Sequence, residues 1–88
     1  MTKQRIQMIK EGLVDLEPLD IQIEDEGHLH VGHAGAKSGG HFKLYIVSEY
    51  FKDMTHINRH KLIYKTLSDL MKTEIHALSI EAKSPNEL

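Results

Sequence analysis

The segment from residue 27 to residue 41 most constrains how this chain can fold. It holds five of the six glycines and four of the seven histidines of an 88-residue protein that has no cysteine. Glycine adopts backbone conformations that other residues avoid, so the segment is poorly suited to a regular helix or strand. It predicts a long connection between the two halves of the chain, and its imidazoles are candidate metal ligands.

Hydrophobic spacing on both sides of this segment predicts five regular elements. Apolar residues that recur every three or four positions indicate amphipathic helices, and apolar residues that alternate with polar ones indicate strands with one buried face. The expected elements are a helix at residues 3–14 with Thr2 as its N-cap, strands at residues 19–25, 41–48 and 74–82, and a helix from Thr55 to about Lys72. The first two strands should pair antiparallel. This α-β-β-α-β order predicts an α+β fold, a three-stranded mixed sheet with helices packed on one face.

The same patterns predict which side chains face the core and which face solvent. The long helix should turn an apolar stripe toward the sheet and its basic residues, Arg59, Lys61, Lys65 and Lys72, toward solvent. The side chains expected to face the core are Leu19, Ile21 and Ile23; Phe42, Leu44 and Ile46; Ile57, Ile63, Tyr64, Leu67, Leu70 and Met71; and His76, Leu78, Ile80 and Ala82. His41, at the start of the second strand, is expected to be a structural hydrogen-bond donor.

Length and charge set further bounds. Eighty-eight residues make a single domain, expected to span residues 1–88 with a flexible polar tail at 83–88. Residues 1–13 hold no apolar run long enough for a signal peptide or a membrane span, so the protein is expected to be soluble and cytoplasmic, with no membrane partner. Seven acidic residues and no lysine or arginine lie between Glu11 and Glu26, which should make part of the surface acidic.

The absence of cysteine limits the chemistry. Such a chain has neither a disulfide nor a thiolate nucleophile, and a soft-metal site must use histidine or borrow ligands from another molecule. The sequence also lacks a nucleophile elbow, a phosphate-binding loop and a metalloprotease motif. We therefore expect no catalytic activity and no small-molecule substrate, and we expect any cysteine-containing metal centre to depend on a partner.

Five short stretches carry a family resemblance when they are taken in order. They are the histidine-bearing segment after the first strand, His41-Phe42-Lys43 with Val47-Ser48, then Phe51, then Arg59-His60-Lys61-Leu62-Ile63-Tyr64, and finally Ile75-His76-Ala77-Leu78-Ser79-Ile80 with Pro85. In this order and spacing the chain resembles the BolA family over nearly its whole length. One position departs from the family pattern, which usually has glycine two residues after the phenylalanine matched by Phe51. Here that residue is Asp53, which tolerates a left-handed backbone less well than glycine.

The resemblance implies a fold similar to the class II KH domain and a specific partner. BolA-like proteins pair with monothiol glutaredoxins in a heterodimer that bridges a [2Fe-2S] cluster. The glutaredoxin cysteine and glutathione hold one iron, and the BolA-like protein offers histidine or cysteine to the other. Without cysteine, this chain corresponds to the histidine type. By position, the ligand on the last strand is His76 and the ligand in the glycine-rich segment is His30 or His33. No cofactor is expected on the isolated chain. The implied function is iron-sulfur cluster assembly, trafficking or regulation.

A second interpretation is a nucleic-acid-binding transcriptional regulator, because members of the family have been regarded as such. The residues that would contact DNA phosphates are Arg59, Lys61 and Lys65. Two observations weigh against it. The Gly-x-x-Gly signature of KH domains is absent from residues 52–72, and a pI near 6.4 is unfavourable for phosphate binding.

Overall fold

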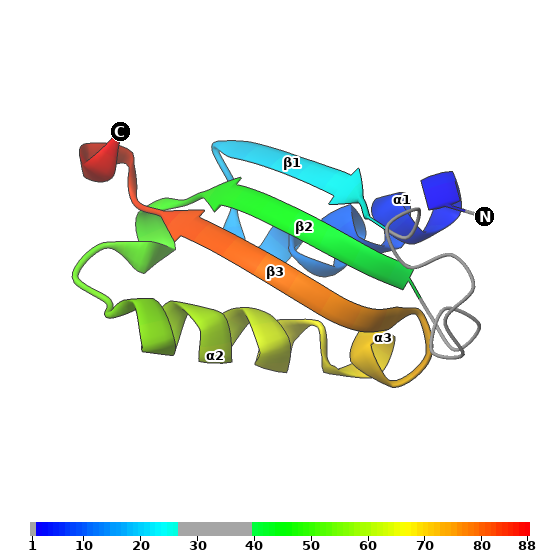
Figure 1. Ribbon diagram of the computed structural model, residues 1–88. Helices are drawn as coiled ribbons and strands as arrows, with labels where there is room; N and C mark the ends of the chain where they lie inside the picture. The colour runs from blue at the N-terminus through cyan, green and yellow to red at the C-terminus, as the bar shows by residue number, and fades with distance from the viewer. Residues whose placement is uncertain (1, 27–39) are drawn as a thin grey trace.

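The fold follows the predicted order of elements, with one division in the long helix. The computed structural model describes residues 2–26 and 40–88 (Figure 1). Its elements, where η marks a short 3-10 helix, are α1 (Thr2–Gly12), η1 (Val14–Leu16), β1 (Asp20–Asp25), β2 (Gly40–Val47), η4 (Glu49–Phe51), α2 (His56–Thr66), α3 (Ser68–Thr73), β3 (Ile75–Lys83) and η5 (Pro85–Glu87). The predicted second helix is divided at Leu67, whose backbone (φ −99°, ψ 16°) ends α2 and precedes α3.

The two long helices begin close to their predicted positions. Thr55 is the N-cap of α2, as predicted, because its side-chain oxygen accepts a hydrogen bond from the backbone N–H of Asn58 at 3.1 Å. Thr2, the predicted N-cap of the first helix, is itself the first residue of α1. In the described part of the chain, no helix combines the length and the apolar character needed to cross a membrane.

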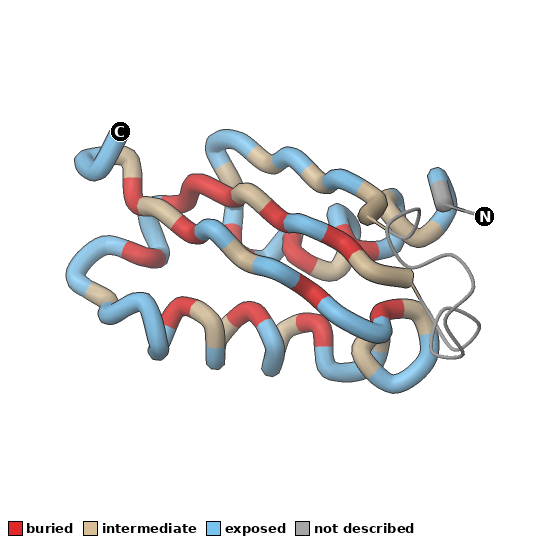
Figure 2. Tube along the Cα trace, in the orientation of Figure 1, coloured by how far each residue is buried: buried red, intermediate tan, exposed pale blue. Residues whose placement is uncertain are grey.

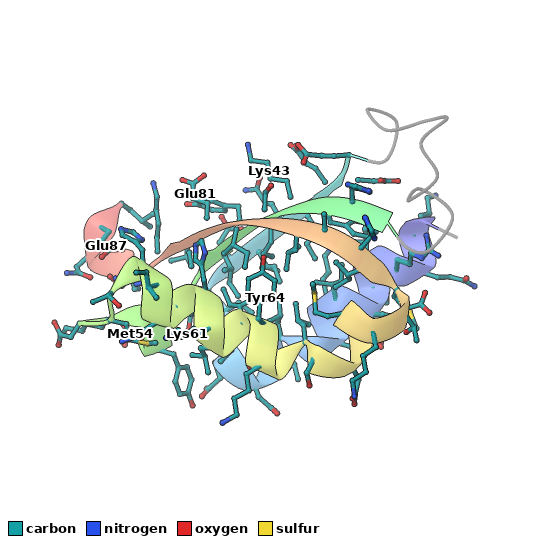
Figure 3. The ribbon with its side chains drawn as sticks, turned by 60° about the horizontal axis from the view of Figure 1, so that its bottom comes forward. Lys43, Met54, Lys61, Tyr64, Glu81 and Glu87 are labelled. Atoms are coloured by element: carbon teal, nitrogen blue, oxygen red, sulfur yellow. The ribbon has the colours of Figure 1, made fainter. Side chains whose placement is uncertain are left out.

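The three strands form one mixed sheet in the order β1-β2-β3. β1 and β2 are antiparallel, as predicted, with Asp25 opposite Phe42, whereas β2 and β3 are parallel, with Phe42 opposite Leu78. A parallel pair needs a long crossover connection, which α2 and α3 supply. The helices lie on one face of the sheet, and Figure 3 shows Lys43 and Glu81 pointing away from them on the open face. The predicted α+β architecture is confirmed.

The core lies between the sheet and the helices, where Figure 2 shows the buried segments in red. Its buried side chains are Ile9, Leu13, Leu16, Phe42, Leu44, Ile46, Phe51, Ile63, Leu67, Ile75, Leu78 and Ala82. Three of the predicted apolar core residues are wrong, since Leu19 is 65%, Ile57 67% and Tyr64 38% exposed. Leu19 precedes the first residue of β1. Ile57 lies about half a helical turn from Arg59, one of the buried residues of α2.

Arg59 was predicted to face solvent, and the structure shows it to be only 2% exposed. Its Nε donates to the carbonyl oxygen of Met54 at 3.0 Å, and its Nη1 donates to that of Ala82 at 2.9 Å. Its two terminal nitrogens also donate to the Glu87 carboxylate at 2.6 and 2.7 Å. These bonds raise the pKa of Arg59 and lower the pKa of Glu87 from 4.5 to about 2. A buried guanidinium with this many partners is not available to a phosphate.

Residues 83–88, predicted as a flexible tail, complete β3 and form η5. Ser84 is 1% exposed. Its backbone N–H donates to the Glu87 carboxylate at 3.0 Å, and the backbone N–H of Glu87 donates to the Ser84 carbonyl at 3.0 Å. Ser84 and Glu87 form a capping box at the start of this short helix. Through Glu87 and Arg59, the end of the chain is bound to α2.

Asp53 has a left-handed backbone, with φ 64°. This conformation agrees with the family pattern, which usually has glycine at this position. Asp53→Gly is therefore expected to raise the free energy of unfolding by about 0.5–1 kcal/mol, because glycine adopts this conformation without strain at Cβ. Urea denaturation at neutral pH measures the change. Lys52→Gly is the matched control, since Lys52 is also exposed but has φ −59°, so glycine there should destabilise. Equal effects of the two substitutions would contradict the strain argument.

Candidate functional site

The candidate site is built around a shift of strand register at the start of β2 and β3. Gly40 pairs with Ile75, whereas the next residue, His41, pairs two positions further along, so His76 is an extra residue on β3. An extra residue reverses the alternation of faces. Ile75 and Leu78 are consequently both buried although they are three residues apart. His76 is exposed, and the prediction that it shares the apolar face with Leu78 is wrong.

His76 lies beside a second imidazole, that of His41. The two ring centroids are 5.0 Å apart and the ring planes are inclined by 47°. His41 precedes the buried Phe42, so the alternation of β2 places His41 on the open face of the sheet. The sequence pattern of β2 could have placed His41 on this face. Its contact with His76 depends on the register shift, which no sequence pattern revealed.

The two residues that flank the segment 27–39, Glu26 and Gly40, are bound next to this histidine pair. On one side, the backbone N–H of Glu26 donates to the carbonyl oxygen of His41 at 2.7 Å. On the other side, the backbone N–H of Gly40 donates to the carbonyl oxygen of Glu74 at 3.1 Å. The segment predicted to carry a ligand therefore leaves and rejoins the sheet at the end where the pair lies.

Of the three predicted ligands, His76 is the one that the structure places. His30 and His33 lie outside the described residues. Within residues 2–26 and 40–88, no group of three histidine, aspartate or glutamate side chains is arranged to hold a metal ion.

An open groove of about 750 Å³ lies along α1 next to Glu74, which is two residues before His76. Its lining residues are Lys3, Gln4, Arg5, Gln7, Met8 and Glu74. Arg5 Nε donates to the Glu74 carboxylate at 3.2 Å, with the two side chains 29% and 30% exposed. This ion pair connects α1 to the turn before β3. The groove reaches the turn before β3, whereas the histidine pair itself lies on the open face of the sheet.

The three predicted phosphate contacts do not form one surface. Arg59 is buried and paired with Glu87, which corrects its assignment as a nucleic-acid contact. Lys61 and Lys65 are exposed on α2, and Figure 3 shows Lys61 on that helix, away from the open face that carries Lys43 and Glu81. Two lysines on one helix are a smaller basic surface than the sequence predicted.

Comparisons with known proteins agree on one family. The BolA-like protein family matches residues 13–87. The chain is 43% identical over 77 residues to the chloroplastic protein BOLA1 of Arabidopsis thaliana, a match that covers 83% of this chain and 48% of that protein. It is 38% identical over 73 residues to the DNA-binding transcriptional regulator BolA of Haemophilus influenzae, covering 83% of this chain and 69% of that protein. The structure of the BolA domain of SufE1 from Arabidopsis thaliana superposes with a TM-score of 0.83, at 42% identity over 93% of each chain.

The match to the family runs from the buried Leu13 to Glu87, the partner of Arg59, and so includes all three strands and the histidine pair. The chain spans 22% of SufE-like protein 1 and about half of BOLA1, the two Arabidopsis proteins that it matches. The name of BOLA1 assigns that relative to the chloroplast, and for this chain a cytoplasmic location stays a prediction. On its sequence and its fold, this chain belongs to the BolA-like protein family.

Proposed function

We propose that this protein binds a monothiol glutaredoxin and shares a bridging [2Fe-2S] cluster with it through histidine ligands. His76 is the ligand from β3, and His30 or His33 is the ligand from the segment between β1 and β2. The observation that supports this proposal is the exposed His76 at the end of the sheet where the segment 27–39 is attached. The role is that of an adaptor in iron-sulfur cluster assembly, trafficking or regulation.

The chemistry of the site suits one side of such a cluster. Neutral imidazole is a good ligand for iron, and an exposed imidazole can reach a cluster that another protein presents. The chain has no cysteine, so every thiolate would come from the glutaredoxin and from glutathione. Histidine in place of two thiolates raises the reduction potential of a [2Fe-2S] centre, which is the chemical property that this chain would add.

The test is the visible circular dichroism of a [2Fe-2S] cluster reconstituted on a monothiol glutaredoxin with glutathione. Adding this protein is expected to change the spectrum until the two proteins are equimolar. His76→Ala should weaken this response by about tenfold or more, because it removes a direct ligand. His56→Ala is the matched control, since His56 is an exposed histidine at the start of α2 and should respond like the wild type.

Separate His30→Ala and His33→Ala variants identify the second ligand. One of the two should lose the spectral response and the other should keep it. The far-ultraviolet circular dichroism spectrum of each variant shows whether the fold is intact. His76→Ala is expected to keep the fold because His76 is exposed. No change on mixing with the wild type, or a wild-type response from all three variants, would remove the ligand assignment.

DNA binding is a second candidate function, favoured by one comparison: the Haemophilus influenzae relative is named a DNA-binding transcriptional regulator. Lys61 and Lys65 are the exposed candidates for phosphate contacts. If both lysines contact phosphates, replacing the two with alanine should make the slope of log association constant against log salt concentration less steep by about two. Fluorescence anisotropy with a labelled duplex at several salt concentrations measures this slope. Affinity that stays undetectable at low salt would end this alternative.

A further inference from the structure

β1 forms an open edge of the sheet. Among the described residues it pairs only with β2, and Figure 1 shows no element along its other side. The N–H of Glu26 bonds to the carbonyl of His41, and ladder bonds alternate along an antiparallel strand. The backbone of Glu24 therefore also faces β2, and the backbone groups of Ile21 and Ile23 face away from it. Their N–H and C=O groups have the spacing that an added strand would bind.

The opposite edge of the sheet, along β3, is closed by side chains of α2. The Tyr64 hydroxyl donates to the carbonyl oxygen of Leu78 at 2.9 Å, and Arg59 Nη1 donates to that of Ala82 at 2.9 Å. Two carbonyls that point away from β2 are thereby occupied by the helix that covers this edge. Strand addition is therefore directed to β1.

The side chains of β1 indicate what kind of strand would fit. Asp20 and Glu24 are exposed, whereas Ile21 and Ile23 are half-buried and pack against the core. An added strand would set its residues directly against these side chains. Basic residues would complement Asp20 and Glu24, and apolar residues would cover the exposed parts of the two isoleucines. A second copy of β1 would bring like charges together, which disfavours pairing between two copies of this chain.

We propose that β1 is a docking edge for an extended segment of a partner protein in which basic residues alternate with apolar ones. Main-chain hydrogen bonds to Ile21 and Ile23 provide the attachment, and Asp20 and Glu24 select the charge of the segment. This edge does not use the histidine pair, so the proposal stands or fails independently of the cluster proposal.

The test uses a short end-blocked peptide of alternating lysine and valine with the full-length protein. At saturating peptide, amide hydrogen exchange at Ile21 and Ile23 is expected to slow by about tenfold or more. The same peptide carrying N-methyl valines lacks the N–H groups that would bond to these two residues and should give no protection. A peptide of alternating glutamate and valine should not bind.

Charge selection is tested with a double variant in which the two exposed acidic side chains of β1 are replaced by neutral ones. Asp20→Asn combined with Glu24→Gln is expected to raise the Kd for the lysine peptide about three- to tenfold, as loss of two cross-strand charge pairs implies. Asp69→Asn combined with Glu49→Gln is the matched control, because it removes the same charges at exposed positions outside the sheet and should leave the Kd unchanged.

In the peptide experiments, three results would overturn the proposal. These are no protection at Ile21 and Ile23, equal binding of the N-methylated peptide, and an equal loss of affinity in the control double variant. Protection of β1 that appears at high protein concentration without peptide would instead identify a second copy of the chain as the occupant and would also overturn it.

Discussion

Arg59→Met is expected to lower the free energy of unfolding by about 3 kcal/mol. Methionine keeps the apolar part of this buried side chain but removes every donor of the guanidinium. The carbonyl oxygens of Met54 and Ala82 would then each lose a hydrogen bond from a charged donor, and each such loss costs about 1–3 kcal/mol. Urea denaturation at pH 7 measures the change. Lys61→Met on the exposed side of α2 is the matched control and should cost less than about 0.5 kcal/mol.

The ion pair also predicts how stability depends on pH. The Arg59 hydrogen bonds lower the pKa of Glu87 to about 2 in the folded protein, against an ordinary value of 4.5. A carboxyl group with a depressed folded pKa stabilises the fold above its unfolded pKa, and this contribution is lost as pH falls from about 4.5 to about 2. Glu87→Gln should therefore be less stable than wild type at pH 7 and should lose less stability over that interval.

Glu81→Gln serves as the control for this pH dependence. Glu81 makes a surface ion pair with Lys83 at 3.3 Å and is half exposed, so its loss should change stability little at any pH. A Glu87→Gln variant with the same acid-induced loss as the wild type would contradict the assignment of that loss to the Arg59 pair.

Gly40→Ala is the second substitution with a large expected effect, about 2–3 kcal/mol of destabilisation. A Cβ at this position would lie 2.4 Å from Cε2 and 2.6 Å from Cζ of Phe42, well inside van der Waals contact. The Phe42 ring is 2% exposed and has little room to move, so the added carbon must displace either the ring or the backbone. Thermal or urea unfolding measures the loss.

Gly12→Ala is the comparison that isolates the steric cause. There the nearest heavy atom is Leu67 Cδ2 at 2.9 Å, at the end of a side chain, and alanine favours the helix in which Gly12 lies. We expect a change of about 1 kcal/mol or less. Similar losses at the two positions would show that the Phe42 contact is not the cause.

Hydrophobic periodicity predicted most of the helices and strands, because these elements depend on local sequence patterns. Phe42, Leu44 and Ile46 alternate along β2 and are all buried, and Thr55 caps α2 as its position before the apolar stripe indicated. The errors have a common origin in tertiary contacts. Arg59 has a charged side chain of the kind that usually lies at the surface. It is buried because Glu87, twenty-eight positions away, supplies the opposite charge. Ile57 is apolar but lies on the side of α2 that the sheet does not cover.

The site was less predictable than the fold. His76 is a candidate ligand by resemblance alone, and what the structure confirms is its place on the last strand. Its exposure was not predicted, because strict alternation assigned it to the core face. The register shift at Gly40 reverses that assignment, and such a shift depends on how two distant strands fit together rather than on either sequence alone. The choice between His30 and His33 stays a prediction, since both lie outside the described residues.

β3 runs in one direction from the histidine pair to the carbonyl that Arg59 binds. A strand of nine residues extends about 30 Å at the usual rise per residue. A fluorophore attached at the exposed Leu88 would therefore lie far from the histidine pair, since Figure 1 shows the C-terminus beyond the end of β3 and away from the start of that strand. This distance is within the range of resonance energy transfer, so labelling the chain end offers a way to follow assembly without disturbing the contact surface.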